Sequence, residues 1–137
     1  MTVTNLDGPH SRQAANEAAA VSKLRTIHEL QTKYAVAHPQ VGFSCELPLL
    51  NSERPLKDSD DSPLRFLDTG VLAGYKFAIG NCSRNPEGVV VHYEVIAFPV
   101  AQGTTGFRAF CADDTGVLWY DEAGLGTTCM ASKHALE

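Results

Sequence analysis

The stretch from Ser11 to His38 constrains the fold most, because it reads as one long helix. Neither Gly nor Pro interrupts it, and the strong helix formers Ala and Leu recur through it. Pro39 ends it, since the residue before a proline is pushed out of helical geometry. At about 1.5 Å per residue the helix is roughly 40 Å long, more than a small domain needs for its own core. We therefore expect its Ala-rich first turns to pack against another chain.

The helix is amphipathic. Its apolar side chains recur at helical spacing and form one stripe, made of Ala20, Val21, Leu24, Ile27, Leu30 and Tyr34. Charged residues such as Lys23, Glu29 and Lys33 lie mostly off this stripe. The pattern predicts that the stripe faces the rest of the domain and that the opposite face is solvated.

Composition narrows the class of protein. A chain of 137 residues is long enough for one domain with a real core. The formal charge of −5 provides no basic field, so we expect no nucleic-acid partner. No apolar run approaches the roughly 18 residues of a membrane span. Residues 1–10 read as a juxtamembrane linker or added leader and 136–137 as tag residues, leaving a domain at 11–135.

The four cysteines, Cys45, Cys82, Cys111 and Cys129, are widely spaced. No pair has CxxC spacing and no closely spaced histidine pair accompanies them, which disfavours a zinc site. Two disulfides in an oxidising compartment fit better. The simplest pairing joins neighbours, Cys45 to Cys82 and Cys111 to Cys129, but the sequence leaves all three pairings open.

Beyond the helix, residues 39–70 read as a polar loop, and from Val71 the apolar period changes to two. Strands are predicted near 71–79, 89–97, 107–112 and 117–120, separated by turn-forming segments at 81–88, 101–106 and 113–116. Residues 121–135 form a Gly-rich tail that we expect to wrap back, held by Cys129. The predicted fold class is α+β, a long N-terminal helix packed on a four-stranded antiparallel β-meander (71–120) and stapled by disulfides.

Several short segments carry a resemblance. The helix contains ANEAAAV and LRTI at residues 15–21 and 24–27, followed by Tyr34 and by PQVGF at 39–43. GYKF at 74–77, FPV at 98–100 and RAFCAD at 108–113 continue the pattern. At this spacing the chain resembles the periplasmic part of bacterial type IV pilins and type II secretion pseudopilins, from residue 11 to about residue 129. The apolar helix half with which that family begins is not part of this sequence.

The resemblance implies a structural subunit of a pilus or pseudopilus, serving assembly, secretion, adhesion or motility without catalysis. It implies a periplasmic or cell-surface location, with an upstream segment anchoring the protein in the inner membrane before assembly. The partners would be copies of itself or other pilin-like subunits. They would bind through one set of helix residues, Ala14, Ala15, Ala18, Ala19, Val21, Leu24 and Ile27. The alternative is a non-polymerising pilin-like binding module, periplasmic or membrane-anchored.

Other chemistry has weaker support. Major pseudopilins hold calcium in a strand loop, and Asp113, Asp114 and Asp121 are the candidate ligands here, but without an Asp-x-Asp-x-Asp-Gly loop a solvated acidic turn is favoured. Asp-Thr-Gly occurs twice, at 68–70 and 114–116, as in the paired loops of aspartic proteases. Two carboxylates that share a proton need two lobes, so a hydrolase ranks third and two turns are favoured. No histidine shows a positioned partner, so we expect no catalytic residue and no cofactor.

Overall fold

A computed structural model describes residues 9–53 and 66–136. It begins with the long helix α1 (Pro9–Ala37), followed by the 3-10 helix η2 (Leu47–Glu53) and the short helix α2 (Phe66–Thr69). Six strands come next, with one helix before the last of them: β1 (Val71–Leu72), β2 (Tyr75–Arg84), β3 (Val90–Pro99), β4 (Ala109–Asp113), β5 (Leu118–Asp121), α3 (Gly126–Ser132) and β6 (His134–Ala135).

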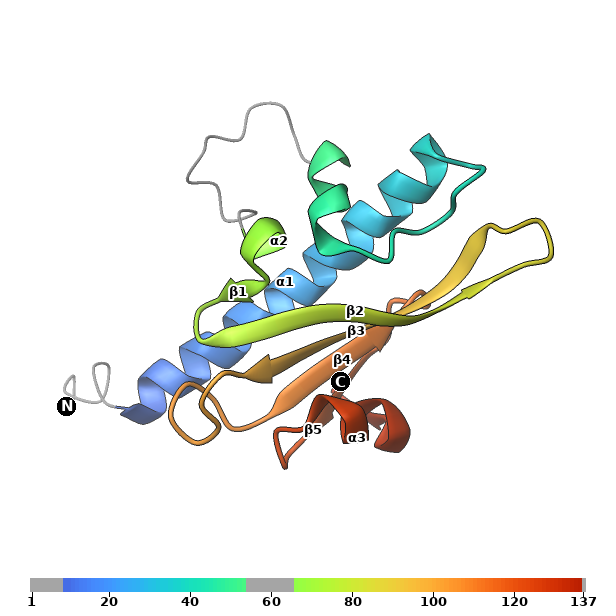
Figure 1. Ribbon diagram of the computed structural model, residues 1–137. Coiled ribbons are helices and arrows are strands. Elements are labelled where there is room, and N and C mark those ends of the chain that lie inside the picture. Colours follow the sequence, from blue (N-terminus) through green and yellow to red (C-terminus); the bar gives the residue numbers. More distant parts are fainter. Residues whose placement is uncertain (1–8, 54–65, 137) are drawn as a thin grey trace.

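The strands form one antiparallel sheet in the order β1-β2-β3-β4-β5-β6, so every strand pairs with its sequence neighbour. Helix α1 runs diagonally behind the sheet, and α3 lies against the lower end of the opposite face (Figure 1). The predicted α+β class, with a long helix packed on an antiparallel meander, is confirmed. None of the described helices is long and apolar enough to cross a membrane.

The predicted helix stripe is the core side of α1. Ala20, Leu24, Ile27, Leu30 and Tyr34 are all at most 8% exposed. They pack in one cluster with the sheet residues whose side chains alternate toward α1, which include Phe77, Tyr93, Val95 and Phe110. The helix ends at Ala37, one residue before the predicted end at His38, and it begins at Pro9, two residues before the predicted start at Ser11.

The prediction of four strands is wrong, because the described residues form a six-stranded sheet. The segment 71–79 was expected to be one strand, but Ala73 and Gly74 both take positive φ angles, of 53° and 76°, and turn the chain between β1 and β2. Further along, β2 continues to Arg84, so the next turn is shorter than the predicted 81–88. The tail also adds a strand, since β6 pairs with β5 after α3.

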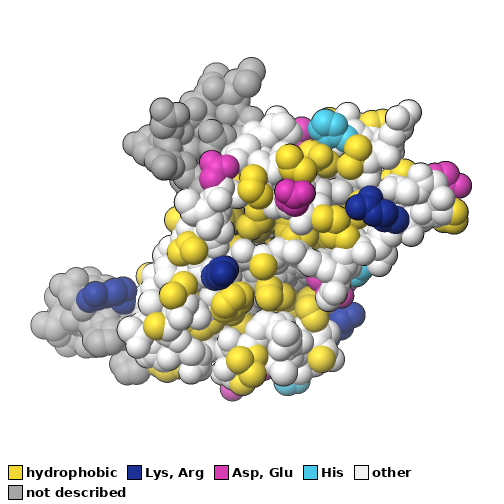
Figure 2. All heavy atoms as spheres, viewed as in Figure 1, with side chains coloured by type: hydrophobic (Ala, Val, Ile, Leu, Met, Phe, Trp, Pro, Cys, Tyr) yellow, Lys and Arg dark blue, Asp and Glu magenta, His cyan; other side chains and the backbone are white. Residues whose placement is uncertain are grey.

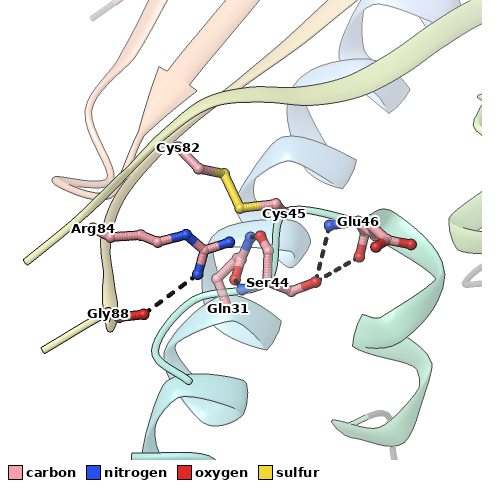
Figure 3. Close-up of a disulfide and its surroundings, with 7 residues drawn as sticks. All are labelled: Gln31, Ser44, Cys45, Glu46, Cys82, Arg84 and Gly88. Atoms are coloured by element: carbon pink, nitrogen blue, oxygen red, sulfur yellow. Dashed lines mark hydrogen bonds between the residues drawn. A yellow bond between two sulfur atoms is a disulfide. The ribbon is translucent and has the colours of Figure 1, made fainter. Parts of the chain in front are cut away.

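Both disulfides join sequence neighbours, as the simplest pairing predicts. Cys45–Cys82 ties the loop after α1 to β2 (Figure 3). Beside it the buried Gln31 amide donates to the Ser44 carbonyl at 2.7 Å and accepts from the Ser44 N–H at 2.8 Å, fixing the same loop to α1. Cys111–Cys129 ties α3 to β4. The described residues hold no free cysteine. Because such bonds persist in oxidising surroundings, they indicate an extracytoplasmic location.

Candidate functional site

The N-terminal half of α1 keeps one side open to solvent. Ala14, Ala15 and Ala18 are exposed, and we call these three residues the alanine face. Ala19 and Val21 are half-buried. Leu24 and Ile27, which the sequence grouped with the assembly residues, are 1% and 0% exposed and belong to the domain's own core. The surface available to a partner is therefore shorter than the resemblance implied, and it is made of small side chains.

A shallow hollow of about 320 Å³ lies next to the alanine face. Ala14 and Ala18 line it together with Val21, Arg108 and Leu136, so the helix, the loop before β4 and the tail all contribute to it. The surface around the exposed alanines is thus concave on one side, which suits the close approach of another elongated element.

The opposite side of the same turns is held by the loop before β4. Gln13 is 4% exposed, and its amide nitrogen donates to the Gly103 carbonyl at 2.6 Å. Asn16 donates to the Thr105 carbonyl at 2.8 Å. The first turns of α1 are thus neither detached nor fully covered: one side is fixed to the domain, and the other is open.

Glu17 makes the strongest of these attachments. One carboxylate oxygen accepts from the backbone N–H groups of Phe107 and Arg108 at 3.1 and 2.9 Å. The other accepts from Nε and Nη2 of Arg108 at 3.1 and 3.0 Å. Nearby, the Tyr75 hydroxyl donates to the Arg108 carbonyl at 2.6 Å. Burial and the charge of Glu17 raise the pKa of Tyr75 despite the opposing charge of Arg108, so this hydroxyl stays a donor.

A second candidate site lies on the outer face of the sheet, the face that α1 does not cover. His92 and Glu94 of β3 meet Asp113 at the end of β4 and Asp114 in the turn that follows, and we call these four residues the His92 cluster. His92 Nδ1 lies 2.5 Å from Asp114 Oδ1, and its Nε2 lies 3.5 Å from Glu94 Oε2. The prediction that no histidine has a positioned partner is therefore wrong for His92.

Electrostatics in the His92 cluster favour the charged imidazole. Partial burial alone would lower the pKa of His92, but the hydrogen bonds and charges of Asp114 and Glu94 outweigh it and raise that pKa. On the α1 side of β3, burial and then the charges of Asp114 and Asp113 raise the pKa of Tyr93. The Tyr93 hydroxyl lies 3.4 Å from Nδ1 of His28 on α1.

An apolar hollow of about 230 Å³ adjoins the His92 cluster, lined by residues of β2, β3 and α3 that include Ala78, Ile96 and Met130. Figure 2 shows hydrophobic side chains gathered near the middle of this face of the molecule. Asn81 and Glu94 also line the hollow, so Glu94 belongs both to it and to the His92 cluster.

The three predicted calcium ligands do not meet. Asp113 and Asp114 lie together, whereas Asp121 pairs with Ala109 at the other end of β4. There Asp121 accepts hydrogen bonds from the Thr128 hydroxyl and, at 3.1 Å, from the Leu125 N–H, which fixes the start of α3. These bonds lower the pKa of Asp121, led by the one from Thr128.

The two Asp-Thr-Gly segments do not meet either. Asp68 accepts a hydrogen bond from the Asn51 amide at 2.6 Å, and its segment leads into β1 at the sheet edge. Asp114 follows β4, and β2 and β3 lie between β1 and β4. Three strand spacings amount to about 14 Å, so the two carboxylates cannot share a proton.

Comparison with protein-family models, with curated proteins and with solved structures finds no match.

Proposed function

We propose that the chain is the periplasmic part of a structural subunit of a type IV pilus or type II secretion pseudopilus. In this proposal the alanine face packs against a neighbouring pilin-like subunit, and the sheet faces outward. The observation that carries the proposal is the exposure of Ala14, Ala15 and Ala18 on a 29-residue helix whose apolar stripe, from Ala20 to Tyr34, packs in the core of its own domain.

Small side chains suit this role because they let two helices approach closely. Helix axes pack 8–10 Å apart depending on the side chains at the contact, and Ala and Gly permit the shorter distances. The first turns of α1 also reach one edge of the domain beside the loop before β4 (Figure 1).

Pilin-like subunits must also resist strain and proteolysis outside the cytoplasm. Two disulfides supply such resistance here, one fixing the loop after α1 and one fixing the C-terminal helix. In the chain-entropy model each crosslink contributes about 3–4 kcal/mol of stability.

The second candidate function is a non-polymerising pilin-like binding module. It is favoured by the attachments of Gln13, Asn16 and Glu17, which hold the first turns of α1 against the chain's own loop. A helix committed to its own domain on one side needs no neighbour for stability, and the apolar hollow on the outer face would then serve a ligand.

The complete reading frame and the N-terminus of the mature protein separate the two candidates. Filament assembly requires about 20 apolar residues continuous with α1, retained after cleavage at a prepilin signal. Mass spectrometry of the protein isolated from its own cells would detect that segment. An ordinary signal peptide, removed just before α1, would contradict assembly and favour the binding module.

A further inference from the structure

We propose that the His92 cluster binds a divalent transition-metal ion of the zinc type, with His92, Asp113 and Asp114 as ligands and Glu94 as an outer contact of His92. His92, Asp113 and Asp114 each offer one ligand atom, and these atoms lie within 4.8 Å of one another. The site lies on the sheet face opposite α1, so it is independent of the alanine face and of filament assembly.

The strand register builds this arrangement. His92 and Glu94 are two residues apart on β3, so their side chains point to the same face of the sheet. Glu94 is paired directly with Asp113 across the β3–β4 ladder, which puts two carboxylates side by side. Like charges directly opposite each other destabilise a sheet, and a bound cation would remove that repulsion.

Asp113 is the buried member of this set, whereas His92 and Asp114 are half-buried. Asp113 is only 7% exposed. Its Oδ1 accepts two hydrogen bonds from Thr115, from the N–H at 2.9 Å and from the hydroxyl at 2.6 Å. Its other carboxylate oxygen accepts no hydrogen bond from the described residues and is not fully buried, so it is open to solvent or to an ion. A carboxylate that is fixed by hydrogen bonds at one oxygen keeps its other oxygen available to coordinate a metal ion.

The donor set selects the class of ion. Imidazole nitrogen together with carboxylate oxygens suits zinc and its first-row neighbours, whereas calcium takes six to eight oxygen ligands. Two of these ligands are already oriented by outer contacts. Glu94 Oε2 lies 3.5 Å from Nε2 of His92, and Thr115 donates hydrogen bonds to Asp113. Such outer contacts fix ligand geometry and strengthen metal binding.

Isothermal titration of the purified, disulfide-bonded chain with zinc chloride tests the proposal. We expect one ion per chain, and a loss of affinity of about tenfold or more in His92→Gln and in Asp114→Asn. His38→Gln is the matched control, because His38 also lies beside a carboxylate, with Nε2 3.7 Å from Glu53 Oε2. This variant should bind zinc as the wild type does.

A second measurement keeps the test clear of folding effects. Cobalt(II) bound through His92 gives a visible absorption spectrum that should be absent in His92→Gln, while circular dichroism reports whether that variant is folded. The proposal is overturned if zinc does not bind up to millimolar concentration, or if folded His92→Gln binds it as tightly as the wild type. Tight calcium binding that survives His92→Gln would also overturn it, since that would identify an oxygen-only site.

Discussion

Replacing Glu17 with alanine should destabilise the domain more than any other single surface change on α1. The carboxylate fixes the N-terminal half of the helix to the loop before β4 through four hydrogen bonds from Phe107 and Arg108. Its side chain is only 13% exposed, so water cannot fully replace those partners when the helix is in place.

The magnitude follows from which groups lose a partner. Hydrogen bonds to a charged group contribute about 1.5–3 kcal/mol each. The Arg108 side chain is 37% exposed and regains water when Glu17 is lost. Its two hydrogen bonds to Glu17 therefore contribute little to the loss in the free energy of unfolding. The two backbone N–H groups carry most of the cost, and alanine regains a few tenths of a kcal/mol as a better helix former. The expected loss in the free energy of unfolding is about 2–3 kcal/mol.

Equilibrium unfolding in urea measures this loss, provided that the denaturant slope stays constant. Glu29→Ala is the matched control: it is the same substitution on an exposed part of α1, with an expected change within about 0.5 kcal/mol. If Glu17→Ala and Glu29→Ala lowered the free energy of unfolding by the same amount, the contacts of Glu17 would not fix the N-terminal half of α1 to the domain.

Three further predictions concern the rest of the fold. Replacing Cys111 and Cys129 together with alanine removes a crosslink between positions 18 residues apart and should cost about 3 kcal/mol in urea unfolding; unchanged stability would contradict the crosslink's role. Gly42→Ala puts a Cβ 2.2 Å from a backbone oxygen at a φ of +86° and should cost more than about 2 kcal/mol. Gly88→Ala, at +87° in open space, should cost only about 1 kcal/mol, and equal costs would show that the close approach is unimportant. Because hydrogen bonding lowers the pKa of Asp121, its stabilisation is present above the unfolded-state pKa and is lost as pH falls through the folded-state pKa. The melting temperatures of wild type and Asp121→Asn should therefore converge in acid, and a constant gap would argue against the shift.

The main features of the fold could be predicted because they depend on local pattern. Helical periodicity in α1 identified the buried stripe, and alternation identified the long strands. The break at Ala73 could not be foreseen, since alanine rarely takes a positive φ, and the turn is made together with Gly74. Apolar residues recur at every second position across this turn, so the sequence indicated a single strand over 71–79.

The candidate sites likewise combine features that the local sequence predicts with features that depend on the folded sheet. The open first turns of α1 were predicted from the length of the helix and its small side chains, whereas the burial of Leu24 and Ile27 depends on the sheet they meet. The His92 cluster was missed because it needs the β3–β4 register, which brings Asp113 beside Glu94. The one local signal was the spacing of two between His92 and Glu94, which puts them on the same face of a strand.

The most direct test of the account is photo-cross-linking of the full-length protein in its own cells, with a photoreactive amino acid replacing Ala18. Glu122, which is equally exposed but lies in the turn after β5, is the control position. We predict a ladder of covalent multimers containing pilin-like subunits from Ala18 and none from Glu122. If the protein were present and folded but remained monomeric after cross-linking from Ala18, the alanine face would not be an assembly surface.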